Sequence, residues 1–108
     1  MASAFKRATA LSGNTRTTVY TCPGSGVLNT IIFSGTAANI DSANKVDHWI
    51  TLEVGTGSPA SVLVQVPVPW GSSIKFPKMV LAPGESLYVT ADVNLTAISA
   101  NISLVERS

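Results

Sequence analysis

The sequence is short of charge and of long apolar runs. Only 12% of its 108 residues are charged and the net charge is +1, against ~25% charged residues in typical soluble domains. So small an excess of positive charge gives no electrostatic means of capturing nucleic acid or an anionic membrane. No stretch approaches the ~18 apolar residues of a membrane span, and residues 1–7 lack the apolar core of a signal peptide. We therefore expect no nucleic-acid or membrane partner, and synthesis in the cytoplasm.

Chemically reactive side chains are also scarce. The single Cys22 cannot form an internal disulfide, and a nucleophilic pair with the single His48 would need a third group to orient the imidazole. A soft-metal site needs several Cys or His ligands. Among the scattered carboxylates, Asp41 and Asp47 either share a loop cation or are solvated loop charges, and we favour the second interpretation. The sequence thus predicts no catalytic residues, no cofactor and no metal, and the protein is not expected to be an enzyme.

Small polar and β-branched residues take the place of charge. Thirty residues are Ser, Thr or Asn, and thirty are Val, Ile or Thr. β-branched side chains suit the pleated surface of a sheet. A free soluble protein usually keeps more surface charge to stay dispersed. The composition therefore favours a β protein that functions in stable contact with neighbouring protein subunits.

Apolar and polar residues alternate along most of the chain, which is typical of strands with one buried face. The clearest case is Ile98–Leu104, in which Ile98, Ala100, Ile102 and Leu104 alternate with polar residues. Eight strands are predicted in this way: Lys6–Leu11, Thr15–Thr21, Val27–Ser34, Trp49–Val54, Ala60–Val66, Ile74–Leu81, Ser86–Ala91 and Ile98–Leu104. Residues 36–47 lack the alternation.

Glycine and proline lie between these runs, where turns need them. Gly55–Pro59 joins two clean strands and is expected to form a hairpin loop. Short strands at regular spacing without intervening helices predict an all-β fold, an antiparallel β-sandwich with about eight strands. A jelly roll or a related Greek key is the favoured version, and an open barrel is the alternative. We expect a single domain over residues 1–108, with residues 1–7 as an extended N-terminal arm.

Aromatic residues are the candidates for binding. Trp49 and Tyr88 alternate onto the outward side of their strands, and Trp70 follows a proline-rich strand end. Such side chains form subunit interfaces, stack on sugar rings, or simply pack within the fold. Basic residues form no patch in the sequence. Lys6, Arg7 and Arg16 are their only concentration, either as a basic arm that reaches an acidic neighbour or as a solvated terminus.

Several motifs occur in an order that resembles the small β-sandwich virion proteins of tailed bacteriophages. They are Thr17–Pro23 before the apolar strand Val27–Phe33, then Val66–Ser73, Met79–Thr90 and the ending Ile102–Glu106. The resemblance runs from Thr15 to Glu106, with a departure at Pro69-Trp70-Gly71-Ser72, where related chains have a plainer Pro-x-Gly. It implies a phage structural protein without fixing its place in the virion.

Within that class, we expect a capsid decoration (cement) protein on the capsid surface that binds and bridges subunits of the major capsid protein. Capsid symmetry favours a homotrimer, with a dimer as the alternative. The residues expected at its interfaces are Phe5, Lys6, Arg7, Trp49, Val68, Pro69, Trp70 and Tyr88. A head–tail junction, tail or baseplate protein is one alternative function, and a carbohydrate- or receptor-binding β-sandwich module is another.

Overall fold

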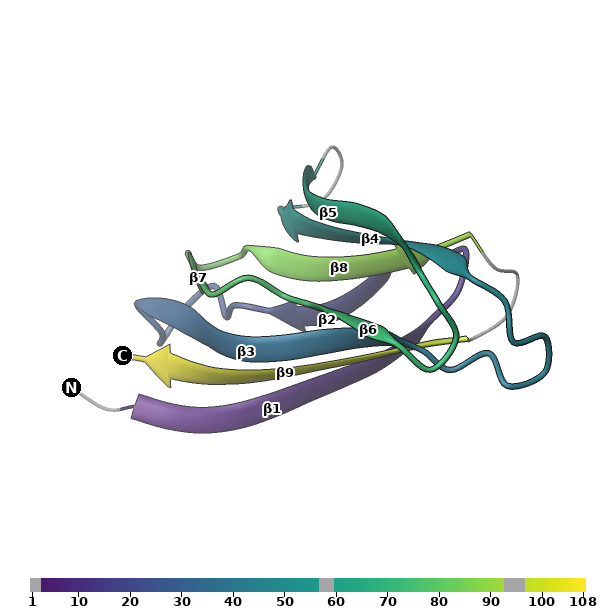
Figure 1. Ribbon diagram of the computed structural model, residues 1–108. Helices are drawn as coiled ribbons and strands as arrows, with labels where there is room; N and C mark the ends of the chain where they lie inside the picture. Colours follow the sequence, from purple (N-terminus) through teal and green to yellow (C-terminus); the bar gives the residue numbers. More distant parts are fainter. Residues whose placement is uncertain (1–2, 57–59, 93–96) are drawn as a thin grey trace.

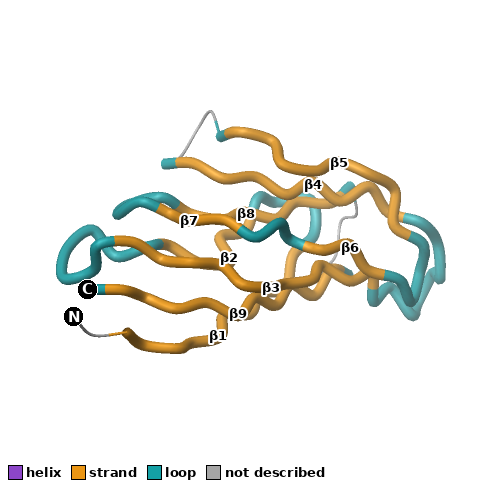
Figure 2. Tube along the Cα trace, turned by 60° about the vertical axis from the view of Figure 1, so that its left-hand side comes forward, coloured by secondary structure: helices purple, strands orange, loops and turns teal. Residues whose placement is uncertain are grey.

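The structure of the protein is a computed structural model that describes residues 3–56, 60–92 and 97–108. These residues form nine strands: β1 (Ser3–Ser12), β2 (Thr17–Thr21), β3 (Asn29–Asn39), β4 (His48–Gly55), β5 (Ser61–Val68), β6 (Ser73–Lys75), β7 (Met79–Leu81), β8 (Ser86–Ala91) and β9 (Ile98–Arg107). The strands make two antiparallel sheets that face each other, as Figures 1 and 2 show. The described residues include no helix, and so none that crosses a membrane.

The strand order is that of a jelly roll. Sheet A has the order β1-β9-β3, with β6 and β7 one after the other along the far edge of β3, and sheet B has the order β2-β8-β4-β5. If β6 and β7 are taken as one interrupted strand, each strand is followed by one in the opposite sheet, except at the β4–β5 hairpin. This is the eight-strand connectivity of two Greek keys. The predicted all-β sandwich is therefore confirmed, with nine strands rather than eight.

The core lies between the two sheets and comes from every second residue of the strands. Ile32 on β3, Leu52 on β4, Leu87 on β8 and Leu104 on β9 are all completely or almost completely buried. Burial of each such side chain contributes about 1.5–3 kcal/mol. Because the inner faces fill the core, only the outer faces and the two ends of the sandwich are left for function.

One predicted strand is broken. Ile74–Leu81 forms the two short strands β6 and β7, because Pro77 has no N–H to give to the ladder and Phe76 turns inward. The Phe76 N–H donates instead to the Gly35 carbonyl at 2.9 Å. β3 is longer than expected and runs to Asn39, paired with β9 throughout. The β4–β5 pair forms as predicted, although residues 57–59 of its loop lie outside the described residues.

The expected N-terminal arm is part of a strand. Residues 3–7 belong to β1, which pairs with β9 in one unbroken register from Ser3↔Arg107 to Ser12↔Ile98. The physical reason is the length of β9, which offers a partner for every residue of β1. Residues 1–2 lie outside the described part of the chain. Since β1 pairs on one side only, it forms the outer edge of sheet A (Figure 1).

Candidate functional site

The residues expected at interfaces fall into two separate groups. Phe5, Lys6 and Arg7 lie on β1, whereas Trp49 and the segment 67–70 lie at the opposite end of the sandwich, where Trp49 pairs with Pro67. Phe5 is 79% exposed, Trp49 51% and Trp70 44%. The structure thus leaves these three aromatic side chains open, on two surfaces.

Two of the expected interface residues are buried and contribute no open surface. Val68 points into the core and is 1% exposed. Tyr88 does lie on the outer face of sheet B, but it is only 7% exposed because the Arg16 guanidinium lies 4.1 Å from its ring centroid. The three-ring platform of Trp49, Trp70 and Tyr88 that would suit a sugar is therefore not formed.

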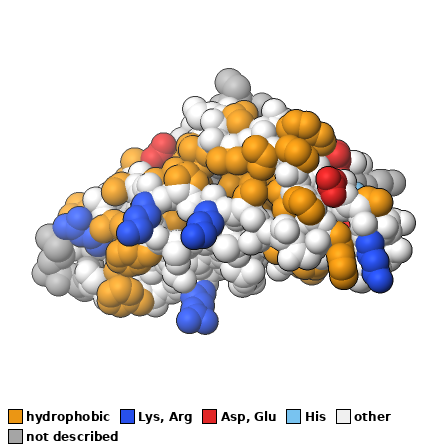
Figure 3. Space-filling view, viewed as in Figure 1, with side chains coloured by type: hydrophobic (Ala, Val, Ile, Leu, Met, Phe, Trp, Pro, Cys, Tyr) orange, Lys and Arg blue, Asp and Glu red, His pale blue; other side chains and the backbone are white. Residues whose placement is uncertain are grey.

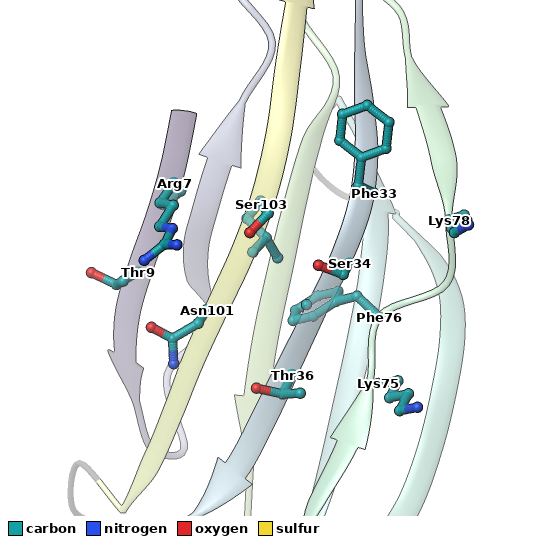
Figure 4. Close-up of a pocket in the computed structure, with 13 residues that line it drawn as sticks. Arg7, Thr9, Phe33, Ser34, Thr36, Lys75, Phe76, Lys78, Asn101 and Ser103 are labelled. Atoms are coloured by element: carbon teal, nitrogen blue, oxygen red, sulfur yellow. The ribbon is translucent and has the colours of Figure 1, made fainter. Parts of the chain in front are cut away.

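A groove of about 600 Å³ crosses the outer face of sheet A (Figure 4). We call it the sheet A groove. Its walls and floor come from β1, β9, β3 and the segment that joins β6 to β7: Arg7, Ala8, Thr9, Phe33, Ser34, Gly35, Thr36, Lys75, Phe76, Lys78, Asn101, Ile102 and Ser103. A neighbouring hollow between Phe5 and Phe33 continues it along β9, and these two rings stack with centroids 6.2 Å apart.

Three local features of the chain produce this concave shape. The β3–β9 register shifts between Ile32 and Ser34, so that Phe33 lies at a bulge. A Cβ at Gly35 would lie 2.5 Å from Cγ2 of Ile102, and the ring of Phe76 takes up the space beside it. Pro77 then interrupts the edge strand between β6 and β7. A bulge, a close approach and a broken edge together open the sheet surface.

The sheet A groove combines cationic, polar and apolar side chains. Arg7 lies on one side and Lys75 and Lys78 on the other, as Figure 4 shows, and all three are exposed. Hydroxyl and amide groups and apolar side chains such as Phe76 line the surface between them, and no Asp or Glu is among the described residues that line the groove. Such a site favours an extended ligand that carries negative charge and hydrogen-bonding groups.

This cluster has no local signal in the sequence, because its members are far apart in the chain. Arg7 comes from β1, and Lys75 and Lys78 flank the break between β6 and β7. Only the jelly-roll pairing, which places β9 and β3 between them, brings the three to one face. The space-filling view in Figure 3 shows several Lys and Arg side chains among hydrophobic and uncharged side chains on the left-hand and lower parts of the molecule.

The second surface is the tip of the sandwich, which we define as residues 39–49 and 67–72. Asn39 ties the two segments together, since its Nδ2 donates to the carbonyls of Val46 and Val68 at 2.8 Å each. Nζ of Lys45 lies 5.3 Å from the centroid of the Trp70 ring. Large apolar side chains are exposed over the tip: Ile40, Val46, Trp49 and Trp70. These loops form the right-hand end of Figure 1.

A buried histidine between two carboxylates supports the tip. Nε2 of His48 lies 2.7 Å from Oδ2 of Asp41, and its Nδ1 lies 3.0 Å from Oδ1 of Asp92. Burial opposes the charge on His48, but the hydrogen bonds to the two carboxylates outweigh it and raise the pKa of the imidazole. The same hydrogen bond lowers the pKa of Asp41, against the opposing effect of burial. Below the raised pKa of His48 and above the lowered pKa of Asp41, the imidazolium and the Asp41 carboxylate therefore form a buried ion pair.

This cluster differs from the arrangements that the sequence suggested. Cys22 lies near Thr30 and the chain termini, where the Thr30 hydroxyl donates to its Sγ at 3.2 Å, so the thiol and His48 are at opposite ends. Asp41 is engaged with His48 and with the backbone N–H of Asn44, while Asp47 is exposed. Over residues 3–56, 60–92 and 97–108, no group of His, Cys, Asp and Glu side chains is arranged to hold a metal ion.

A second buried cluster lies at the end of the sandwich that holds both termini. Nζ of Lys6 lies 2.8 Å from Oε1 of Glu106, and the Tyr20 hydroxyl donates to Oε2 at 2.6 Å. These two interactions lower the pKa of Glu106. Burial and the bond to Glu106 raise the pKa of Tyr20. Lys6, which was expected at an interface, thus forms an ion pair within its own fold.

Comparison of the chain with protein families, with curated proteins and with solved structures found no match.

Proposed function

We propose that this protein is a bacteriophage capsid decoration protein, which binds the outer capsid and bridges subunits of the major capsid protein without catalysing a reaction. The observation that carries the proposal is the presence of two separate open surfaces on one small rigid sandwich. The tip exposes Trp49 and Trp70, and the outer face of sheet A exposes Phe5 and Phe33. A protein that bridges subunits needs two such surfaces, whereas a simple binding module needs one.

The character of the two surfaces supports the proposal. Trp and Tyr side chains are enriched where protein interfaces bind most strongly, because they bury a large area at a low cost in conformational entropy. The jelly roll places these side chains on strands or on loops fixed by Asn39, so little order must be gained on binding. Many weakly bound copies on one particle gain avidity from the assembly itself.

Quantitative mass spectrometry of purified virions tests the proposal. A decoration protein is present at a ratio to the major capsid protein within a few-fold of unity. A ratio lower by an order of magnitude or more would favour a head–tail junction, tail or baseplate protein. Absence of the chain from particles would overturn a structural role.

Particles that lack the protein provide a second test, which locates the contact. Purified protein should bind such particles and delay genome release on heating. Trp70→Ala removes an anchor from the tip and should weaken binding about ten-fold or more, in the range of an interface anchor. The matched control is Val62→Ala, because Val62 is also an exposed apolar residue, 58% exposed, but lies on the outer face of sheet B away from both surfaces.

The sheet A groove supports a second candidate of another class, recognition of an acidic oligosaccharide. Its cations suit carboxylates, its floor suits sugar hydroxyls, and the exposed ring of Phe33 suits the apolar face of a sugar. Calorimetric titration with trigalacturonic acid and with its neutral methyl ester tests this function. Binding of the acid alone, weakened several-fold by Lys75→Gln but unchanged by Lys45→Gln at the tip, would support it. Failure of both sugars to bind would exclude this ligand class for the groove.

A further inference from the structure

The lateral edges of the two sheets differ in how well they are protected against pairing with another chain. Interruptions of an edge strand, prolines and bulges are the devices that prevent such pairing. β6 and β7 have three residues each and are separated by Pro77. The β2 ladder shifts between Thr18 and Tyr20, and β5 contains Pro67 and a shift of its own. Three of the four edges are therefore blocked.

β1 has no interruption, no proline and no bulge, and its charged side chains Lys6 and Arg7 are the only such device that it carries. Its ten residues contain no proline and pair with β9 without a bulge. No strand of the described chain pairs with its other side, so every second backbone N–H and C=O of β1 faces outward from the sheet. Figures 1 and 2 show the N-terminal part of β1 as the outermost strand of sheet A. Such an edge is a template for a further antiparallel strand.

The side chains of β1 indicate which strand would pair with this edge. Phe5 and Leu11 both point to the outer face of sheet A, and they are 79% and 57% exposed. They lie at equal distances along the strand from Ala8. We propose that a second copy of this chain pairs antiparallel with β1 about a two-fold axis at Ala8. In this register, Phe5 of each copy lies opposite Leu11 of the other.

The charges on β1 select the same register. With Ala8 opposite Ala8, Arg7 faces Thr9, and Lys6 faces Ala10 while it remains paired with Glu106 at 2.8 Å. A shift of the pairing by one step toward the N-terminus would place Arg7 opposite Arg7, which is destabilising. A shift by one step toward the C-terminus would place Leu11 opposite Arg7. Phe5 would then lie opposite a position beyond the end of β1 in the other copy. Of these three registers, only the one centred at Ala8 pairs the apolar side chains and keeps like charges apart.

This pairing does not depend on the virion role. A two-fold contact through β1 gives a dimer with one continuous sheet A, and it is the dimer rather than the trimer of the two oligomers considered from the sequence. Phe5 then belongs to the contact between copies, and the tip stays free for a different partner. Copy number in virions tests the proposed function, whereas the state of the free protein tests this contact.

Sedimentation equilibrium over a dilution series provides the first test. We expect a dimer that dissociates to monomers on dilution, and a monomer at all concentrations for Phe5→Lys/Leu11→Lys. Val80→Lys is the matched control, because Val80 is 60% exposed on β7, at the opposite edge of sheet A, and should leave the dimer intact. A wild-type monomer at every concentration, a trimer, or a dimer that survives the double substitution would overturn the proposal.

Disulfide cross-linking tests the register and does not rely on destabilising the dimer. Directly opposed residues of paired strands have Cβ atoms about 4.5–5.5 Å apart, close enough for oxidation to link cysteines there. Phe5→Cys/Leu11→Cys should form a covalent dimer under mild oxidation, while Phe5→Cys alone and Leu11→Cys alone should not. The native Cys22 is buried and need not be replaced. Absence of cross-linking in the double variant, or equal cross-linking in a single variant, contradicts this register.

Discussion

The two ends of the sandwich each bury a carboxylate cluster, but a different cation balances the charge at each end. At the end that holds the termini, Lys6 pairs with Glu106, which also accepts a hydrogen bond from Tyr20. At the tip, His48 lies between Asp41 and Asp92. A lysine keeps its charge across the neutral range, whereas a histidine loses its charge within reach of that range.

The difference has a consequence for the two open surfaces. β1, with Phe5 and Arg7, adjoins the cluster whose charge is constant near neutral pH. The tip, with its exposed tryptophans, is held by the cluster that titrates. We therefore expect the tip to loosen at alkaline pH while the terminal end keeps its geometry. Substitutions of Glu106, Lys6 and His48 test that contrast, and the largest effect is expected at Glu106.

Glu106→Ala should have the largest effect on stability. It removes the acceptor of the Tyr20 hydroxyl at a position that is 9% exposed, and the loss of a hydrogen bond to a charged group costs about 2 kcal/mol. For a domain of this size, that corresponds to a fall in Tm of about 10 °C. Thermal unfolding at pH 7 followed by circular dichroism measures the change.

Lys6→Ala separates the two partners of Glu106. The Lys6 side chain is 54% exposed, so its ion pair is screened by solvent and should contribute less than about 1 kcal/mol. Equal losses from Glu106→Ala and Lys6→Ala would show that the ion pair, rather than the buried hydrogen bond to Tyr20, stabilises this end.

His48→Gln should have a smaller effect that depends on pH. The folded-state pKa of His48 is raised above its ordinary value of 6.5, so its stabilising contribution is complete below pH 6.5 and is lost as the pH rises through the raised value. Asp41 sets the acid limit, because its lowered pKa stabilises the fold above its ordinary 3.8 and this gain is lost as the pH falls through the lowered value. Between these limits, His48→Gln should cost about 1–2 kcal/mol.

Urea unfolding at pH 5.5 and at pH 9 checks this expectation. The difference in free energy between the wild type and His48→Gln should shrink at the higher pH, while the cost of Glu106→Ala should remain the same at both. Glu106 has a lowered pKa, so it is ionised at both values and its contribution fades only in acid, below its ordinary 4.5. A cost of His48→Gln that is equal at both pH values would remove the contrast between the two ends.

The strands were predictable from the sequence because alternation is a local signal. β8 matches its predicted bounds Ser86–Ala91, and β4 and β9 extend theirs by a few residues. The break between β6 and β7 also had a local signal, since Pro77 lies within the predicted strand Ile74–Leu81, but the apolar residues around it concealed the interruption. Exposure was harder to predict, as Tyr88 shows, because its cover comes from Arg16 on another segment.

The clusters and the groove could not be predicted, because they depend on which strands become neighbours. Glu106 meets Tyr20 only after β2 and β9 face each other across the core, 86 residues apart in sequence. Asp47, the residue next to His48 in the sequence, is not one of its partners. Arg7 joins Lys75 and Lys78 across two intervening strands. Both clusters and the groove therefore depend on the jelly-roll pairing of the strands rather than on a sequence motif.

Lys45 at the tip should show the smallest effect, and the size of this effect depends on the substitution. Lys45 has a φ of 53°, in the left-handed region, while its ammonium lies 5.3 Å from the Trp70 ring centroid. Lys45→Ala removes the cation–π contact, worth about 0.5–1 kcal/mol at an exposed site, and keeps the strained backbone. Lys45→Gly also removes the contact but relieves about 1 kcal/mol of strain, so its stability should be close to that of the wild type. Urea unfolding of both variants at pH 5.5 measures which of the two is more stable. If Lys45→Gly were less stable than Lys45→Ala, the loop would not be strained, and the charged cluster at His48 would have less to hold in place.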